Sequence, residues 1–255
     1  FNVATGSAYN TAVGAAAGGA VTTGVQNTLI GGLAGDAITD ADFNVAVGYA
    51  ALGADTLGHK NTAIGYGTLA SHNPATAADT VNTALGYNAG TSVSTGTLNT
   101  LIGGLVGDAL TTGSDNVSVG YQSLSTDTLG SHSVAVGRNA LLSQNFTTAT
   151  NTYNVAVGSS AGQSITTGTK NTLIGGLAGD ALTTGITNVA VGYQALSSDT
   201  LGKRSVAIGN AALFTQNLTT ATDTYNVAVG ESAGLSVTTG TALTLIGGLA
   251  GDALT

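Results

Sequence analysis

Few side chains in this sequence are of the types that perform chemistry. The 255 residues include no Cys, three His and only 7% charged side chains. None of the three His (His59, His72 and His132) lies beside a Ser nucleophile together with an acidic partner, so the sequence offers no catalytic triad. We therefore predict that the chain is not an enzyme and holds no cofactor.

Four Asp residues recur at 72-residue spacing, each closing a Gly-Gly-Leu-Ala/Val-Gly-Asp segment. Calcium-binding repeats use a related glycine- and aspartate-rich pattern. One Asp per 72 residues cannot supply the about six to eight oxygens that calcium takes, so we expect no metal site in a single chain. The remaining alternative is an ion on a symmetry axis between several chains, for which the candidates are Asp36, Asp108, Asp180 and Asp252.

A second set of Asp residues also recurs at 72-residue spacing, and each is followed within six residues by basic or imidazole side chains. We expect these residues to form exposed ion pairs, which contribute roughly 0 to 1 kcal/mol and mainly serve solubility and register. The groups are Asp55 with His59 and Lys60, Asp127 with His132, and Asp199 with Lys203 and Arg204.

These residues belong to an internal repeat that covers the chain. A five-residue block of the form Asn-Val/Thr-Ala/Leu-Val/Ile-Gly occurs fourteen times, at intervals of 17, 17, 17 and 21 residues, so four copies span 72 residues. We call each repeat a coil and number its positions from the Asn. The sequence predicts a single solenoid segment of a longer fibre, divided into a partial coil at 1–9, super-repeats at 10–81, 82–153 and 154–225, and a partial super-repeat at 226–255.

Each coil has the pattern of one circuit of a flattened β-solenoid. Val or Thr at position 2 and Val, Ile or Leu at position 4 give the β-branched, period-two pattern of a strand. Position 3 is Ala, Leu or Ser and must face the other side. A later Ser/Ala-x-Thr segment predicts a second short strand. Position 1 is Asn in eleven of fourteen coils, which predicts a ladder of stacked Asn side chains.

Position 5 is Gly in every coil, which predicts a corner where the backbone has positive φ or passes close to its neighbour. We therefore predict an all-β fold, a parallel β-solenoid or β-roll. The corner residues are Gly14, Gly31, Gly48, Gly65, Gly86, Gly103, Gly120, Gly137, Gly158, Gly175, Gly192, Gly209, Gly230 and Gly247.

Composition limits the partners of this solenoid. The net charge is −8 and the five basic residues are scattered, so nucleic acid is not an expected partner. The longest runs without polar side chains have ten residues, too few for membrane insertion by this segment. The predicted strands are apolar on both faces, and such sheets are covered on both sides. We expect further copies of the chain, in a closed cyclic assembly, to provide that cover.

Every fourth coil carries four extra residues. The first of these inserts covers Thr76 to Val81, and the others end the segments Gln144 to Tyr153 and Gln216 to Tyr225. Loops on a rigid scaffold often bind ligands, although the favoured interpretation is that these inserts seal a corner or touch a neighbouring chain. The candidate residues for a sugar or protein receptor are Asn145, Phe146, Tyr153, Asn217, Leu218 and Tyr225.

A further set of aromatic residues lies directly after the corner glycines. A Tyr row at one coil position is expected to pack its rings along the solenoid, with a carbohydrate platform as the alternative. The five residues are Tyr49, Tyr66, Tyr87, Tyr121 and Tyr193.

The blocks Ser-Val-Ala-Val-Gly at Ser133, Ser-Val-Ala-Ile-Gly at Ser205 and Asn-Thr-Ala-Ile-Gly at Asn61 resemble the head repeat of trimeric autotransporter adhesins, the YadA-like family, and related tail-fibre repeats of phages and viruses. The resemblance covers essentially the whole chain. It implies a left-handed β-roll, a homotrimer, an extracellular place on a bacterial surface or phage virion, and an adhesive or receptor-binding fibre.

Two other functions stay open. Thr, Ser or Asn occupies position 13 in all fourteen coils, which is compatible with an ice-binding solenoid. Such a surface needs paired Thr columns, whereas position 11 is more often Ser or Ala. A purely structural filament of chains stacked end to end is the third possibility, because solenoids normally need polar caps and both ends of this segment fall within a coil.

Overall fold

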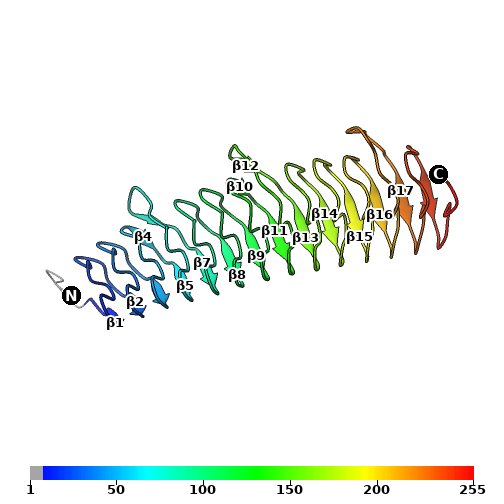
Figure 1. The fold of residues 1–255 in the computed structure, drawn as a ribbon. Coiled ribbons are helices and arrows are strands. Elements are labelled where there is room, and N and C mark those ends of the chain that lie inside the picture. The colour runs from blue at the N-terminus through cyan, green and yellow to red at the C-terminus, as the bar shows by residue number, and fades with distance from the viewer. Residues whose placement is uncertain (1–7) are drawn as a thin grey trace. The chain divides into compact units, whose positions relative to one another are not determined.

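The computed structural model describes residues 8–255, so residues 1–7 of the predicted partial coil 1–9 lie outside the described range. Within that range there are strands and turns but no helix. The chain divides into two compact units. The first holds the described residues up to Ser131 with Thr147–Ala149, and the second holds His132–Phe146 and Thr150–Thr255. Figure 1 shows each unit as a stack of coils whose main strands form a row of arrows, with short additional strands such as β4 and β12 apart from that row.

The described part of the first unit contributes seven three-residue strands and three two-residue strands. The longer strands are β1 (Thr11–Val13), β2 (Thr28–Ile30), β3 (Val45–Val47), β5 (Thr62–Ile64), β7 (Thr83–Leu85), β8 (Thr100–Ile102) and β9 (Val117–Val119). The shorter ones are β4 (Gly58–His59), β6 (Ala78–Asp79) and β10 (Gly130–Ser131).

The described part of the second unit contributes seven three-residue strands and one two-residue strand. The longer strands are β11 (Val134–Val136), β13 (Val155–Val157), β14 (Thr172–Ile174), β15 (Val189–Val191), β16 (Val206–Ile208), β17 (Val227–Val229) and β18 (Thr244–Ile246). The shorter one is β12 (Thr150–Asn151).

Neighbouring three-residue strands within a unit pair in parallel and in exact register. Thr28 pairs with Val45 across a 17-residue coil, and Thr62 pairs with Thr83 across a 21-residue coil. The four extra residues therefore leave the register unchanged and loop outward. In Figure 1 the insert beside β4 and the one before β17 rise above the neighbouring coils of their own units. The predicted fold, an all-β parallel β-solenoid, is confirmed.

The corner glycines behave as predicted. All fourteen have φ between 124° and 141°, a region that residues with a Cβ rarely adopt. The backbone also passes very close to the next coil at these positions. A Cβ on Gly103 would lie 2.4 Å from the carbonyl oxygen of Gly120, which is far inside van der Waals contact.

The second strand predicted in each coil is wrong. The Ser/Ala-x-Thr segment has turn and bend geometry instead, as at residues 37–39. The turns that lead into it contain left-handed residues, such as Leu33 at φ 57° and Gly35 at φ 53°, which an extended strand does not contain. Hydrogen bonds between successive coils continue nevertheless, since the amide of Ala20 donates to the carbonyl of Asp36.

A thin core fills each coil. Position 3 points inward and is fully buried, as at Leu29, Ala46 and Leu101. Where position 3 is Leu, position 9 of the same coil is Gly, and a Cβ on Gly35 would lie 2.8 Å from Leu29. In the first coil of each super-repeat both positions are small, as at Ala84 and Gly90, and leucines of the neighbouring coils fill the space: a Cβ on Gly90 would lie 2.7 Å from Leu101. Small and large residues thus complement one another within and between coils, which keeps the interior filled.

The predicted Asn ladder is confirmed and has a second role. Asn44 Oδ1 accepts the backbone N–H of Asn61 in the next coil at 2.8 Å. Asn44 Nδ2 donates to the carbonyl of Gly58, fourteen residues later in its own coil, at 2.9 Å. Each such Asn therefore closes its own circuit and fixes the position of the next one.

Substitution of adjacent glycines tests the corner geometry. Gly103→Ala should lower the stability by roughly 1 to 3 kcal/mol from backbone strain alone, with a further cost because its Cβ meets the Gly120 carbonyl. Gly104→Ala is the matched control, because its Cβ meets only Tyr121 at 3.6 Å. Thermal unfolding followed by circular dichroism would measure both. Equal melting temperatures for the two variants would contradict the corner assignment.

Candidate functional site

Side chains at position 12 point into the solenoid, and their character changes within each super-repeat. In the first two coils they are apolar, as at Val21 and Ile38, whereas in the third and fourth coils they are polar and still fully buried. The polar residues at this position are Asp55, His72, Asp127, Gln144, Asp199 and Gln216. A buried polar cluster therefore lies next to every insert.

In the first unit the cluster is centred on Asp55. Its Oδ1 accepts the backbone N–H of Gly58 at 2.7 Å, and its Oδ2 lies 2.7 Å from His72 Nδ1. His72 Nε2 lies 3.4 Å from Asn82 Nδ2. An amide nitrogen can only donate, so this arrangement fits an imidazole that donates from Nδ1 and accepts at Nε2. Asn61 completes the cluster by donating to Asp55 Oδ2 at 3.3 Å.

In the second unit Gln216 takes the place of the imidazole. Its Nε2 donates to Asp199 Oδ2 at 2.6 Å and to Ser205 Oγ at 2.9 Å, and its Oε1 accepts from Asn226 Nδ2 at 2.8 Å. Ser205 also replaces the Asn of the ladder, and its hydroxyl lies 2.6 Å from Thr224 Oγ1. Asn61 with His72 in the first unit, and Gln216 beside Ser205 in the second, are thus two ways to provide hydrogen-bond donors for the buried Asp.

The expectation of exposed ion pairs at Asp55, Asp127 and Asp199 is wrong. All three carboxylates are fully buried and each binds the backbone N–H three residues later. The physical reason is that they sit at position 12, which faces the core. The basic residues pair instead with the returning arm of the insert: Lys60 with Asp79, and Arg204 with Asp223 at 3.2 Å.

The candidate residues around the inserts fall into two groups. Phe146 and Leu218 are buried, 6% and 5% exposed, so they seal the corner beneath the insert. Asn217 Oδ1 accepts a hydrogen bond from Thr200, and Asn145 donates its backbone N–H to Thr166.

The insert tyrosines Tyr153 and Tyr225 are about half exposed and precede the ladder position, at the start of the strand face. Tyr153 packs against the ring of His132, and Arg204 lies 5.6 Å from the ring centroid of Tyr225.

The four candidate metal residues do not gather within the chain. Each occupies the turn after its corner glycine and is partly buried, and Asp180 Oδ1 accepts a hydrogen bond from Ser197 at 2.6 Å. Among residues 8–255 there is no group of three or more His, Cys, Asp or Glu placed to hold a metal ion. An ion on an axis between chains stays a hypothesis for Asp36, Asp108, Asp180 and Asp252.

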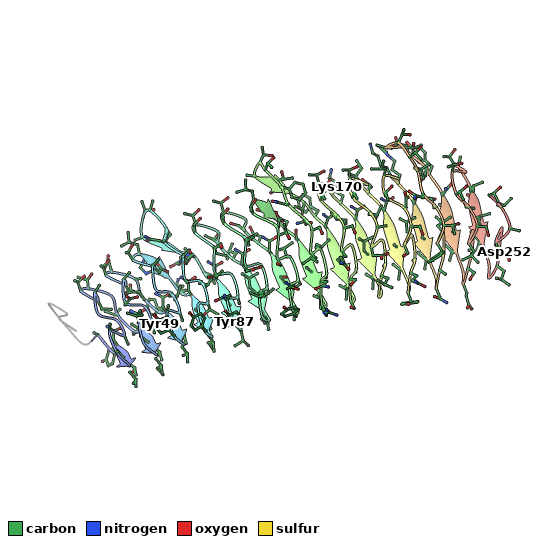
Figure 2. The ribbon with its side chains drawn as sticks, viewed as in Figure 1. Tyr49, Tyr87, Lys170 and Asp252 are labelled. Atoms are coloured by element: carbon green, nitrogen blue, oxygen red, sulfur yellow. The ribbon has the colours of Figure 1, made fainter. Side chains whose placement is uncertain are left out.

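The tyrosines after the corners form a stack in the first unit. Tyr49 and Tyr66 have ring centroids 5.4 Å apart, and Tyr66 and Tyr87 have centroids 5.5 Å apart, both at an interplanar angle of 16°. Figure 2 shows Tyr49 and Tyr87 on the same edge of the coils. Because the faces cover one another, the stack offers its ring edges, rather than flat faces, to a ligand.

Positions 2 and 4 of the three-residue strands form the outward face of the solenoid, which we call the strand face. Position 2 is Thr or Val and position 4 is Val, Ile or Leu, so no charge interrupts it. Several of its large side chains are well exposed, including Ile30, Leu85 and Ile174. No pocket interrupts the surface of the described residues.

The hydroxyl groups at position 13 form hydrogen bonds within the solenoid. The hydroxyls of Thr22, Thr39 and Thr111 donate to the backbone carbonyl at position 13 of the next coil, at 3.1, 3.2 and 2.9 Å. Hydroxyls that donate along the solenoid are not free to donate to an ordered water lattice.

Together, the in-register parallel strands, the closing Asn amides and the positive-φ corner glycines define a β-solenoid repeat protein. Comparison of the chain with protein-family models and with curated proteins finds no match. No helix among the described residues has the length and apolar character needed to span a membrane.

Two Asp residues of one super-repeat test the buried cluster. Asp199→Ala leaves the N–H of Gly202 and one N–H of Gln216 without an acceptor, so it should destabilise the second unit by roughly 2 to 6 kcal/mol, at about 1 to 3 kcal/mol per orphaned donor. Asp223→Ala removes an exposed ion pair with Arg204 and a long, exposed hydrogen bond from the Tyr225 hydroxyl, and should cost at most about 1 kcal/mol. Denaturant unfolding of both variants measures the difference, and a tolerant Asp199 would contradict the role of the cluster.

Proposed function

We propose that the chain is a segment of an extracellular fibre, the shaft or head of a bacterial surface adhesin or a phage tail fibre, and that it functions as a homotrimer. Its role is mechanical and adhesive rather than enzymatic. The sequence resemblance to trimeric adhesin and tail-fibre repeats supports this proposal, and the solenoid fold is compatible with it.

The observation that carries the proposal is the uncharged strand face. In each unit, exact register aligns the Val, Ile and Leu side chains of position 4 from one coil to the next in a continuous apolar column, beside a position 2 column in which Val and Thr are mixed. Exposed apolar surface costs about 25 cal/mol per Å² relative to burial, and parallel sheets are normally covered on both faces. An apolar face of this extent is typical of an interaction surface.

A further copy of the same chain is the partner that best matches this face. Parallel strands repeat at about 4.8 Å along a solenoid, and a second solenoid presents side chains with the same repeat. A closed ring of copies buries all strand faces around one axis and leaves none over for open-ended aggregation. This partner also fits the absence of charge from both columns.

Adhesion would then arise from repetition. Inserts recur once in each super-repeat, and polar columns run along the other side of each coil. Many weak contacts to a cell-surface glycan or protein, made by three chains at once, give an avidity that no single contact supplies.

The oligomeric state tests this proposal. The parent chain should have three times the 24.6 kDa mass of one chain in multi-angle light scattering. Ile174→Asp places a carboxylate on the strand face and should shift the population toward monomer, because a buried unpaired charge is costly. A folded parent that stays a 24.6 kDa monomer at working concentration would overturn the proposal.

Thr167→Asp is the matched control. It adds the same charge in the preceding coil, at an exposed site away from the strand face. It should keep the parent mass. Dissociation by both variants equally would show that charge alone, not the strand face, controls assembly.

A further inference from the structure

The tyrosine stack carries an inference beyond the proposed function. Tyr49, Tyr66 and Tyr87 occupy the same coil position in three successive coils of the first unit, and their rings overlap nearly in parallel. Tyr121 and Tyr193 occupy the same position elsewhere, but the preceding coil has Gly104 or Gly176 there instead of a ring. The chain therefore has one stacked set of phenols and two separate phenols at equivalent places.

The stacked rings are both close together and accessible. The three side chains are between 50% and 57% exposed, so a diffusible oxidant reaches them. They are linked to neighbouring coils whose register is fixed by backbone hydrogen bonds, such as the amide of Gly67 to the carbonyl of Tyr49 at 2.9 Å. Because exposed side chains change rotamer on the picosecond to nanosecond scale, adjacent rings can bring their ortho carbons together without opening the solenoid.

We propose that Tyr49, Tyr66 and Tyr87 form an oxidative cross-linking site, where hydrogen peroxide acting through a haem peroxidase couples neighbouring phenols. Each of two phenols loses one electron and one proton to give a phenoxyl radical. The radicals form one carbon–carbon bond between ring carbons ortho to oxygen, and the two ortho hydrogens move to the oxygens to restore the phenols. The two electrons and two protons reduce one hydrogen peroxide to two waters.

The product would join successive coils covalently. A solenoid unfolds by separation of neighbouring coils, since each coil contacts mainly its neighbours. A bond from Tyr66 to either neighbour closes a short loop of chain and restricts that separation, in the way a disulfide restricts the unfolded state. The cross-link would therefore slow unfolding of this part of the first unit.

The experiment is treatment of the full chain with horseradish peroxidase and hydrogen peroxide, followed by dityrosine fluorescence and peptide mass mapping. We expect linked peptides that join Tyr49 to Tyr66 or Tyr66 to Tyr87, each lighter by two hydrogens than the sum of its parts. Equal recovery of links at Tyr121 or Tyr193, or no dityrosine at all, would overturn the proposal.

Two variants separate stacking from mere exposure. Tyr66→Phe keeps the ring but removes the shared phenol, and the remaining Tyr49 and Tyr87 lie two coils apart, so the intramolecular link should be almost entirely lost. Tyr121→Phe removes a phenol of similar exposure and should leave the yield unchanged. A link yield unaffected by Tyr66→Phe contradicts the proposal.

Coupling between different chains is distinguished by isotopes. A mixture of unlabelled and ¹⁵N-labelled protein, co-refolded before oxidation, gives linked peptides of mixed labelling only when the bond joins two chains. The proposal predicts links of uniform labelling at the stack. Predominantly mixed links would overturn it and would indicate that the tyrosine column lies at an interface between copies.

Discussion

The buried amide at coil position 1 is the interaction on which the register of each unit depends. Its nitrogen donates to a carbonyl near the end of its own coil, and its oxygen accepts the amide of the next coil, as at Asn44. A buried amide without partners costs about 1 to 3 kcal/mol. A slip of one residue in any coil would leave this amide unpaired and would also turn the apolar strand positions to the wrong face.

The long coils show what happens where this closure is interrupted. The four extra residues move the closing carbonyl away, so Asn61 donates to Asp55 instead and its oxygen accepts from Thr80 at 2.9 Å. In the corresponding coil of the second unit a Ser replaces the Asn, and Gln216 donates to both Asp199 Oδ2 and the Ser205 hydroxyl, so it supplies the bond that Asn61 makes to Asp55. The buried polar residues therefore exist because the insert exists, which explains why both recur with the same period.

The sequence predicts the strands, corners and ladder because these features repeat in every coil and depend on local residue types. The buried carboxylates escaped the prediction because their lysine, arginine and histidine neighbours in sequence suggested ion pairs. The informative comparison was between the same position in successive coils, not between neighbours in sequence. Position 12 is Val21 and Ile38 in the first two coils and Asp55 and His72 in the next two, so it faces the core throughout. The second strand failed for a different reason: the turns that precede it contain left-handed Leu and Ala residues, and these residue types give no clear sign of that backbone conformation.

The need to close each coil and fill its interior restricts the residue types on the inward side of each strand but not those on its outward side. Position 3 must fill a narrow interior and position 1 must close the coil, so both are restricted to a few residue types. Positions 2 and 4 meet no such internal demand, yet they never carry a charge in any of the fourteen coils. A surface exposed only to water would be expected to accept charged residues somewhere along this length. In the homotrimer proposed above, burial of the strand face against the same face of a neighbouring copy would account for their complete exclusion.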